Sequence, residues 1–445
     1  MTIEVSTLSD TADLNLKARV DRSIYLSELL NLRSPTPLEW LNAVRDRATA
    51  IVQEQAIPTT RDEEWRFTNL SSLLQVSFQR AEAATIGYAE IQPFLLPETT
   101  NSRLVFVNGF YAADLSAVDD LPEGVLAGNL IGIAEFIPAL ADYLAMQPGA
   151  EEVFTALNTA SLTDAAIVHI PKNQIVEAPI QILYVTIASE TPKLNQPRCL
   201  TISEVGSQVT LIEDHVTFGE GVYFTNPVTE IWVAENAGVR HTRVQRDSEM
   251  AFHIGKTAVS QARNSRYTCT AVSLGAEMSR HNLEIYQTGE QTETTLNGLT
   301  VLNHQQIGDT HSKIAFSKPH GKSNQVNKCI VSDRAHAIFN GKILVPKPAQ
   351  LTDAAQLSRN LLLSAKARID TKPQLEITAD NVKCAHGATV SQLEDDEVFY
   401  LQSRGLKQSE AQKLLTYAFA IDIINQIPIS SLCTILANLI RTQSL

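Results

Sequence analysis

The middle of the chain, between about residues 160 and 390, consists of short runs in which apolar and polar residues alternate. Runs such as IQILYVTIA, QVTLIEDHV, TEIWVAE and LEIYQT are rich in β-branched residues. This pattern predicts strands with one buried face. Turn residues, among them Gly206, Gly275 and Gly289, separate the runs. Because no helical pattern lies between the runs, a doubly wound α/β sheet is excluded.

Two all-β architectures fit this pattern. A sandwich needs tight hairpins, yet Asn-Gly pairs, which favour two-residue hairpin turns, are few: Asn297-Gly298 and Asn340-Gly341. In a parallel β-helix the strands stack rung on rung, and no hairpin is required. The pattern alone does not choose between a sandwich and a solenoid.

The N-terminal part of the chain has a helical pattern. Residues 16–32 and 38–56 carry apolar positions three and four apart, and prolines mark the breaks, so the chain is predicted to be helical up to about residue 95. Trp65 and Phe67 are predicted to anchor the core of this region. A strand-like run, Arg103 to Tyr111, follows.

The C-terminal part is also predicted to be helical. Asp395 or Asp396 is expected to cap one helix, Gly405 to end it, and Ser409 to Gln412 to form a capping box for the next. That next helix carries more apolar surface than a helical pair can hide, so it either packs on the β region or docks a partner. Three regions are expected: a helical and mixed region (1–150), a β core (151–390) and a helical region (391–445).

Composition excludes several classes of function. The chain has 445 residues, 44% of them hydrophobic, and can bury a large core. A net charge of −13 argues against nucleic-acid binding. No apolar run approaches membrane-spanning length, and the N-terminus lacks the pattern of a signal or transit peptide. The five scattered cysteines form no disulfide framework, so we expect a cytoplasmic, reducing location.

Motifs for nucleotide chemistry are incomplete. Gly255-Lys256-Thr257 resembles the end of a P-loop, but Met250 stands where the motif needs a glycine, so no ATPase activity is expected. None of the ten histidines belongs to an HExxH motif. His304, His311 and His320 share one polar segment, but the sequence does not show that they converge, and we assign none of them as a ligand.

Cys384 and His386 are the strongest candidates for metal ligands. The segment Pro373 to Val382 before them alternates and is predicted to be a half-buried strand. In a strand, residues two apart project from the same face with Cα atoms about 7 Å apart, so both side chains can reach one iron or zinc ion. Two ligands do not complete a four-coordinate site, so the others must come from elsewhere, for example from a second chain. The alternative is a buried cysteine beside a satisfied histidine.

Three blocks of sequence resemble one known family. The run KCAHGATV followed by DDEVFYLQSRGL, the segment from Asn340 to Ile377, and the segment from Ile57 to Leu70 are similar to the SufB/SufD family of iron–sulfur cluster assembly proteins. The family motif usually has Ser where Ala385 stands, on the side of the strand away from the metal. A cysteine that SufB tends to have near Ser358 is absent, and Cys384 and His386 lie in a SufD-type motif. Both features resemble the SufD branch.

The resemblance decides the fold and implies a function. It implies a right-handed parallel β-helix core, flanked by N-terminal and C-terminal helical regions, in a mainly β protein. It implies a non-enzymatic subunit of the SUF complex that pairs with SufB through the β-helix and binds the ABC-type ATPase SufC through its C-terminal helices. Cys384 and His386 would contribute ligands to iron or nascent cluster at the SufB–SufD interface.

The same resemblance implies that the isolated chain binds no cluster stably and holds iron or an iron–sulfur cluster only transiently in the complex. A homodimer remains open for the chain without its partner. Two alternatives also remain open. One is a SufB-like scaffold that holds a cluster alone, and the other is a β-helix enzyme acting on polysaccharide, which would need a carboxylate cluster.

Overall fold

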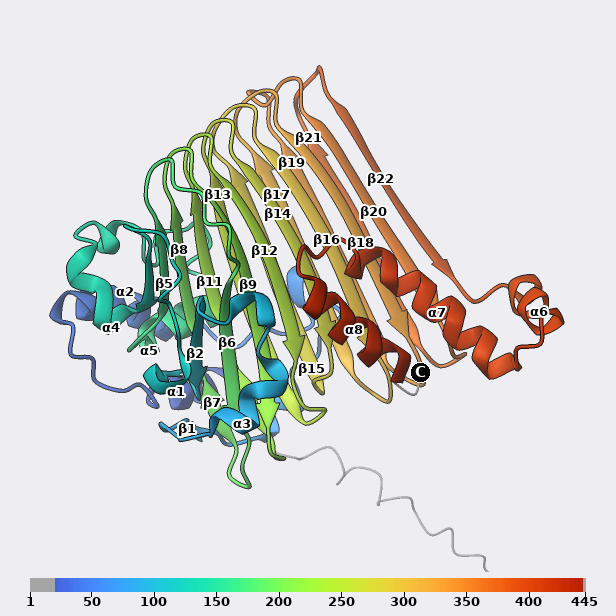
Figure 1. Cartoon of the computed structure of the whole chain (residues 1–445), viewed down its shortest axis with the longest axis horizontal. Helices are drawn as coiled ribbons and strands as arrows, with labels where there is room; N and C mark the ends of the chain where they lie inside the picture. Colours follow the sequence, from blue (N-terminus) through green and yellow to red (C-terminus); the bar gives the residue numbers. More distant parts are fainter. Residues whose placement is uncertain (1–20, 443–445) are drawn as a thin grey trace, which may run out of the picture.

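The core of the protein is a parallel β-helix (Figure 1). The computed structural model describes residues 21–442. Two sheets face each other, and every strand pair is parallel except the short pairs β2–β3 and β4–β5. The predicted parallel β-helix with helical regions at both ends is therefore confirmed, and the sandwich is not formed.

Consecutive turns of the chain, called rungs here, each add one strand to each sheet. Sheet A contains β4 (Leu126–Asn129), β5 (Ala166–Ile170), β8 (Arg198–Ser203), β11 (Val228–Val233), β13 (Ala251–Gln261), β15 (Met278–Gln287), β17 (Ile307–Phe316), β19 (His336–Val345) and β21 (Arg368–Ile377), with β1 (Gln79–Arg80), β7 (Lys193–Asn195) and β10 (Tyr223–Thr225) beside this path. Sheet B contains β3 (Phe110–Tyr111), β2 (Arg103–Val107), β6 (Ile180–Ile187), β9 (Gln208–Phe218), β12 (Gly238–Arg246), β14 (Arg266–Leu274), β16 (Glu293–Leu302), β18 (Lys322–Val331), β20 (Asp353–Leu362) and β22 (Lys383–Ser391).

The alternation in the sequence becomes an inside and an outside of the solenoid. Inward side chains such as Val259, Ile285, Ile314 and Ile343 stack in register along the lumen, the space between the two sheets. Cys269 is fully buried in the same core. Because successive strands lie in register, one residue type at one position lines the lumen over several rungs.

The N-terminal region covers the outer face of sheet A. Its helices α1 (Arg22–Leu30), α2 (Glu39–Gln53), α4 (Leu130–Ile133) and α5 (Val153–Ser161) belong to this cover. The short helix α3 (Tyr88–Ile91) packs instead on the outer face of sheet B, where Ile91 is buried with Val105 and Leu183. Trp65 and Phe154 pack with the outward residues Phe252 and Met278 in one cluster, which confirms Trp65 as an anchor. Phe67 is only half-buried.

The prediction of a helical chain up to residue 95 was too broad. Helical periodicity is realised in α1 and α2, but irregular chain and short turns fill most of residues 54–87. Pro58 and the polar run around Arg61 favour this outcome because they break the apolar repeat. Residues 16–20 of the first predicted helix lie outside the described residues.

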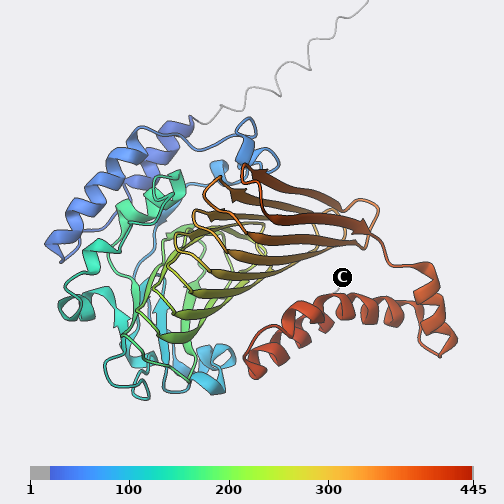
Figure 2. The same cartoon turned by 90° about the horizontal axis from the view of Figure 1, so that it is seen from above.

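The C-terminal helices lie against the outer face of sheet B. They are α7 (Gln408–Ile424) and α8 (Ser430–Thr442), and α6 (Asp395–Ser403) precedes them beyond the last strand. Ile424 and Leu436 are buried with the outward residues Leu299 and Ile330 of the sheet. Figure 2 shows α1 and α2 (blue) and the C-terminal helices (red) on different sides of the solenoid. Packing on the β region, one of the two sequence alternatives, therefore accounts for most of this apolar surface.

The predicted end of α6 and the predicted caps of α6 and α7 were correct to within one or two residues. Gly405 has a φ of +95°, as its predicted role at the end of α6 requires. Glu394 rather than Asp395 or Asp396 is the N-cap of α6. The cap of α7 is Lys407, whose backbone N–H donates to Glu410 Oε2 at 2.8 Å, so the predicted box is displaced by two residues.

Candidate functional site

Cys384 and His386 lie on β22, the last strand of sheet B. Strand β22 pairs in parallel with β20, and the register sets Cys384 beside Ala354 and His386 beside Gln356. Ala354 and Gln356 are buried and face the lumen. Cys384 and His386 therefore project from one face of the strand, toward the lumen, and Cys384 packs against the lumen core.

The exposure of these two residues differs from that of their neighbours in the preceding rung. Among the described strands, β22 pairs with β20 alone, and β21 pairs with β19 alone, so β21 and β22 form the terminal rung, whose outer edge is free (Figure 1). Cys384 is consequently only half-buried and His386 is exposed. Side chains that would be sealed in any earlier rung are accessible here.

The strand predicted before these residues is divided in the structure. Pro373–Ile377 is the second half of β21 in sheet A, residues 378–382 form a turn, and Cys384 belongs to sheet B. The alternating pattern continues through Thr378 and Ala379, which explains the error. Because each sheet keeps its own alternation, the predicted common direction of Cys384 and His386 is nevertheless found.

The electrostatic environment keeps the Cys384 thiol protonated. Partial burial raises the pKa of Cys384, and the negative charge of Asp353 raises it further, while a hydrogen bond from the backbone of Ala354 acts against them. A metal ion bound at this thiol must therefore displace a proton. Within residues 21–442 no group of three or more His, Cys, Asp or Glu side chains is arranged to hold a metal ion.

His304, His311 and His320 do not converge. His304 and His320 lie in turns at opposite ends of β17, and both have positive φ. His311 lies in the middle of β17 on the outer face, where it contacts Asp309 at 3.0 Å and Glu64 at 3.2 Å. These contacts fasten the N-terminal region to sheet A. None of the three is brought near Cys384.

A second group of polar residues fills part of the lumen in the earlier rungs. We call it the lumen network; its members are Glu213, His215, His241, Arg243, Asp247, His253 and His281. Glu213 Oε1 lies 2.8 Å from His215 Nε2, and its Oε2 lies 3.3 Å from His241 Nε2. Burial alone would raise the pKa of Glu213, but these hydrogen bonds hold it well below its usual range.

His253 is the most constrained member of the lumen network. Its Nδ1 lies 2.9 Å from Asp247 Oδ2, and its Nε2 accepts from Arg243. Burial lowers the pKa of His253 to about 4, and the guanidinium of Arg243 adds to this effect against the opposing charge of Asp247. Burial alone would raise the pKa of Asp247, but His253 and Gln245 hold it at about 2. Sequence reasoning missed this network because its members are far apart in the chain.

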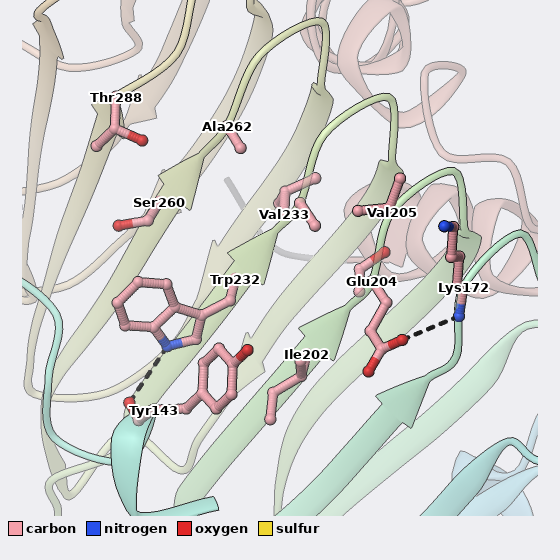
Figure 3. A pocket seen from close by; sticks show the side chains of 12 residues that line it. Tyr143, Lys172, Ile202, Glu204, Val205, Trp232, Val233, Ser260, Ala262 and Thr288 are labelled. Carbon is pink, nitrogen blue, oxygen red and sulfur yellow. Dashed lines mark hydrogen bonds between the residues drawn. The ribbon is translucent and has the colours of Figure 1, made fainter. Parts of the chain in front are cut away.

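A cavity lies far from β22, on the outer face of the early rungs of sheet A. Its volume is about 420 Å³, and it is lined mainly by Trp232, Tyr143, Ile202, Val205 and Val233 (Figure 3). Trp232 Nε1 donates to the carbonyl of Tyr143 at 3.2 Å, which fixes the indole. At its polar end, Glu204 already contacts His169 and the backbone N–H of Lys172. Among the residues that line the cavity, Glu204 is the one carboxylate, and there is no histidine or cysteine.

Helix α6 extends past the end of the solenoid (Figure 1). Phe399 is 70% exposed and Tyr400 57% exposed, although both are large aromatic residues. Val398 on the same helix is buried. None of the described helices is long and apolar enough to cross a membrane.

Two family models together match almost the whole chain. The SufBD protein N-terminal region matches residues 27–182, and the SufBD core domain of the SUF system for FeS cluster assembly matches residues 185–419. The chain belongs to the SufBD family. The match to the SufBD core domain includes the terminal rung and α6, so both are part of the family fold.

Curated relatives support this membership over most of the chain. An iron–sulfur cluster assembly SufBD family protein of Synechocystis is 48% identical over 425 residues, which cover 94% of each chain. The protein ABCI7 of Arabidopsis chloroplasts is 33% identical over 89% of this chain and 84% of its own length. The iron–sulfur cluster assembly protein SufD of Escherichia coli is 32% identical over 82% of this chain and 84% of its own.

Proposed function

We propose that this SufBD family chain is a non-catalytic subunit of an iron–sulfur cluster assembly complex, in which it has the part of SufD. It pairs with a SufB-type paralogue through the free edge of its terminal rung. Cys384 and His386 contribute two ligands to iron or nascent cluster at that interface. The observation that carries the proposal is the position of both side chains on the lumen face of a terminal strand whose outer edge is free.

The small number of ligands supports a shared site. A thiolate and an imidazole leave at least two positions of a tetrahedral metal open. The free edge of β22 offers backbone N–H and C=O groups to another strand, and Val390, near the end of the same strand, is 47% exposed. A second chain that adds a strand here would bring its own ligands next to Cys384.

The C-terminal region supports binding of a SufC-type ATPase. Because α7 and α8 bury most of their apolar residues against sheet B, the docking surface is reduced to α6 and the groups next to it. Phe399 and Tyr400 are the large exposed residues there, and aromatic residues are frequent anchors of protein interfaces. We place the ATPase contact on α6.

All five cysteines, which lie within the described residues, are free thiols, as a reducing compartment would allow.

Anaerobic reconstitution with iron and sulfide tests this function. The isolated chain should retain no visible absorbance of a cluster after desalting, whereas its complex with the SufB-type paralogue should retain it. In the complex, Cys384→Ala and His386→Ala should each abolish the retained absorbance. Thr389→Ala is the matched control, because Thr389 lies on the same strand but on its opposite face.

Two outcomes would contradict the proposal. A stable cluster on the isolated chain would favour the alternative of a self-sufficient scaffold. If the complexes formed with Cys384→Ala and with His386→Ala both retained the full cluster absorbance, the ligands would lie elsewhere. The polysaccharide enzyme of the sequence analysis has no observation in its favour now that the family is known.

A further inference from the structure

A buried carbonyl oxygen next to the terminal rung has no hydrogen-bond partner. Gln356 lies on β20 beside His386, and only 3% of it is exposed. Its Nε2 donates to Gln325 Oε1 at 2.9 Å. Its Oε1 is buried and unpartnered within the part of the chain that the structure describes. A buried polar atom without a partner destabilises the folded chain, so a donor is expected to reach this oxygen.

The direction of this oxygen follows from the hydrogen bond of the same amide. The nitrogen and oxygen of a carboxamide point to opposite sides of the group. Nε2 of Gln356 faces Gln325, which lies in the preceding rung in register with Gln356. Oε1 therefore faces the following rung, where the register places His386. In stacks of Gln side chains, each amide donates to one neighbour and accepts from the other.

The two preceding rungs hold the amide of Gln356 in this orientation. Gln325 is itself fixed, since its Nε2 donates to Ser312 Oγ at 2.8 Å. Across the lumen, Gly341 leaves the space that the amide fills, because a Cβ at this position would lie 2.1 Å from Gln356 Nε2. Ser312, Gln325 and Gln356 thus form a buried polar ladder that ends in an acceptor.

We propose that Gln356 is a positioning residue for His386. Its Oε1 accepts a hydrogen bond from one ring N–H of His386, and the other ring nitrogen keeps its lone pair for a metal ion. The exposed imidazole has the freedom to turn into this contact. The role rests on the proposed function, since only a ligand needs a fixed ring. Loss of such a partner typically lowers metal affinity about 10–100-fold.

Nitrogen NMR of the histidine rings tests the contact in the full chain without metal. The chain is labelled with ring-¹⁵N histidine, and the His386 signals among ten histidines are assigned by their loss in His386→Gln. In the native chain, the neutral His386 ring should show a single tautomer. In Gln356→Met, which keeps the length of the side chain, both tautomers should be populated as in a free imidazole.

Two further variants make the result specific. Gly341→Ala keeps Gln356 but displaces its amide, so it should also release the tautomer. Gln261→Met removes another buried lumen amide on β13, away from His386, and should leave the His386 signals unchanged. Mixed tautomers in the native chain, or an unchanged single tautomer in both Gln356→Met and Gly341→Ala, would overturn the proposal. If Gln356→Met fails to fold, the native chain and Gly341→Ala decide.

Failure of this inference can be told apart from failure of the proposed function. In the complex with the paralogue, Gln356→Met should weaken iron retention about 10–100-fold. If the tautomer responds to Gln356 while His386→Ala leaves cluster retention intact, the positioning contact exists but the ligand function is wrong. If His386→Ala abolishes cluster retention but Gln356→Met leaves the His386 tautomer unchanged, His386 is a ligand and the contact with Gln356 is absent.

Discussion

The lumen network and the terminal rung are built on the same strand pattern but differ in how far their side chains are enclosed. In both, side chains of alternating strand positions point into the lumen and stack on the rung before. The lumen network is closed by rungs on both sides, and its two carboxylates, Glu213 and Asp247, each contact a histidine. The terminal rung has a neighbour on one side only, so a thiol and an imidazole stay accessible. Position along the solenoid axis therefore decides whether inward-facing side chains are sealed in the fold or stay accessible.

Removal of Asp247 should give the largest loss of stability. Asp247 accepts from Tyr223 at 2.8 Å, from Gln245 at 2.8 Å and contacts His253 at 2.9 Å. Asp247→Ala leaves these groups and the nearby guanidinium of Arg243 without their carboxylate, so we expect a loss of about 3–5 kcal/mol in the free energy of unfolding. Urea denaturation measures it.

The matched control for this prediction is Glu249→Ala, two residues further on. The side chain of Glu249 is 67% exposed, so its removal should change the free energy of unfolding by less than about 0.5 kcal/mol. An equally small effect of Asp247→Ala would mean that the lumen network does not hold the solenoid together.

Acid should weaken the fold through His253. The folded-state pKa of His253 is about 4, below its ordinary value of 6.5, so the contribution is fully present above pH 6.5. As the pH falls from 6.5 toward 4, His253 becomes protonated in the unfolded chain but stays neutral in the folded chain. The free energy of unfolding should therefore fall by an amount on the order of 3 kcal/mol. Asp247, with a pKa of about 2, extends the loss below pH 3.8. The melting temperature measured against pH should fall over this range.

Substitution of the candidate ligands should change stability far less. Cys384→Ala and His386→Ala together should lower the free energy of unfolding of the isolated chain by no more than about 1 kcal/mol, because the terminal rung is open to solvent. Thermal unfolding of the isolated chain measures this effect. A loss as large as that of Asp247→Ala would mean that both residues stabilise the fold. It would favour the alternative of a buried cysteine beside a satisfied histidine.

Changes on α6 should leave the isolated fold unaffected. Phe399→Ser with Tyr400→Ser should alter the free energy of unfolding by less than about 0.5 kcal/mol, since both side chains are mostly exposed. Loss of two aromatic anchors should nevertheless weaken binding of the SufC-type ATPase about 30-fold, measured by calorimetry. Gln402→Ala on the same exposed helix is the control. Unchanged binding would show that the docking surface lies elsewhere.

The sequence predicts the repetitive part of the fold better than its junctions. Alternation identified the strands and their inward faces, and it placed Cys384 and His386 on one side. It did not show where β21 ends and β22 begins, because Thr378 and Ala379 continue the alternation through the turn. Nor did it choose the solenoid, since pairing partners about thirty residues apart, such as Asp353 and Lys383, leave no local signal.

Contacts between distant residues account for the rest of what the sequence did not predict. Glu213 and His241 meet only because two strands lie in register, and His311 reaches Glu64 across most of the chain. Gln356 carries no motif of its own. Its place beneath His386 could be found from the sequence only once the rung length was known.

The free edge of β22 also has a consequence for a chain that is made without a partner to cover it. An edge strand left uncovered is a template for any other strand, including that of an identical molecule. Copies made in excess of the partner would meet end to end, which is how a homodimer of the lone chain would arise. Under the proposed function, synthesis of the two subunits in equal amounts would cover the edge of β22 and keep the solenoid soluble. The edge that forms the complex would thus also favour an equal ratio of the two subunits.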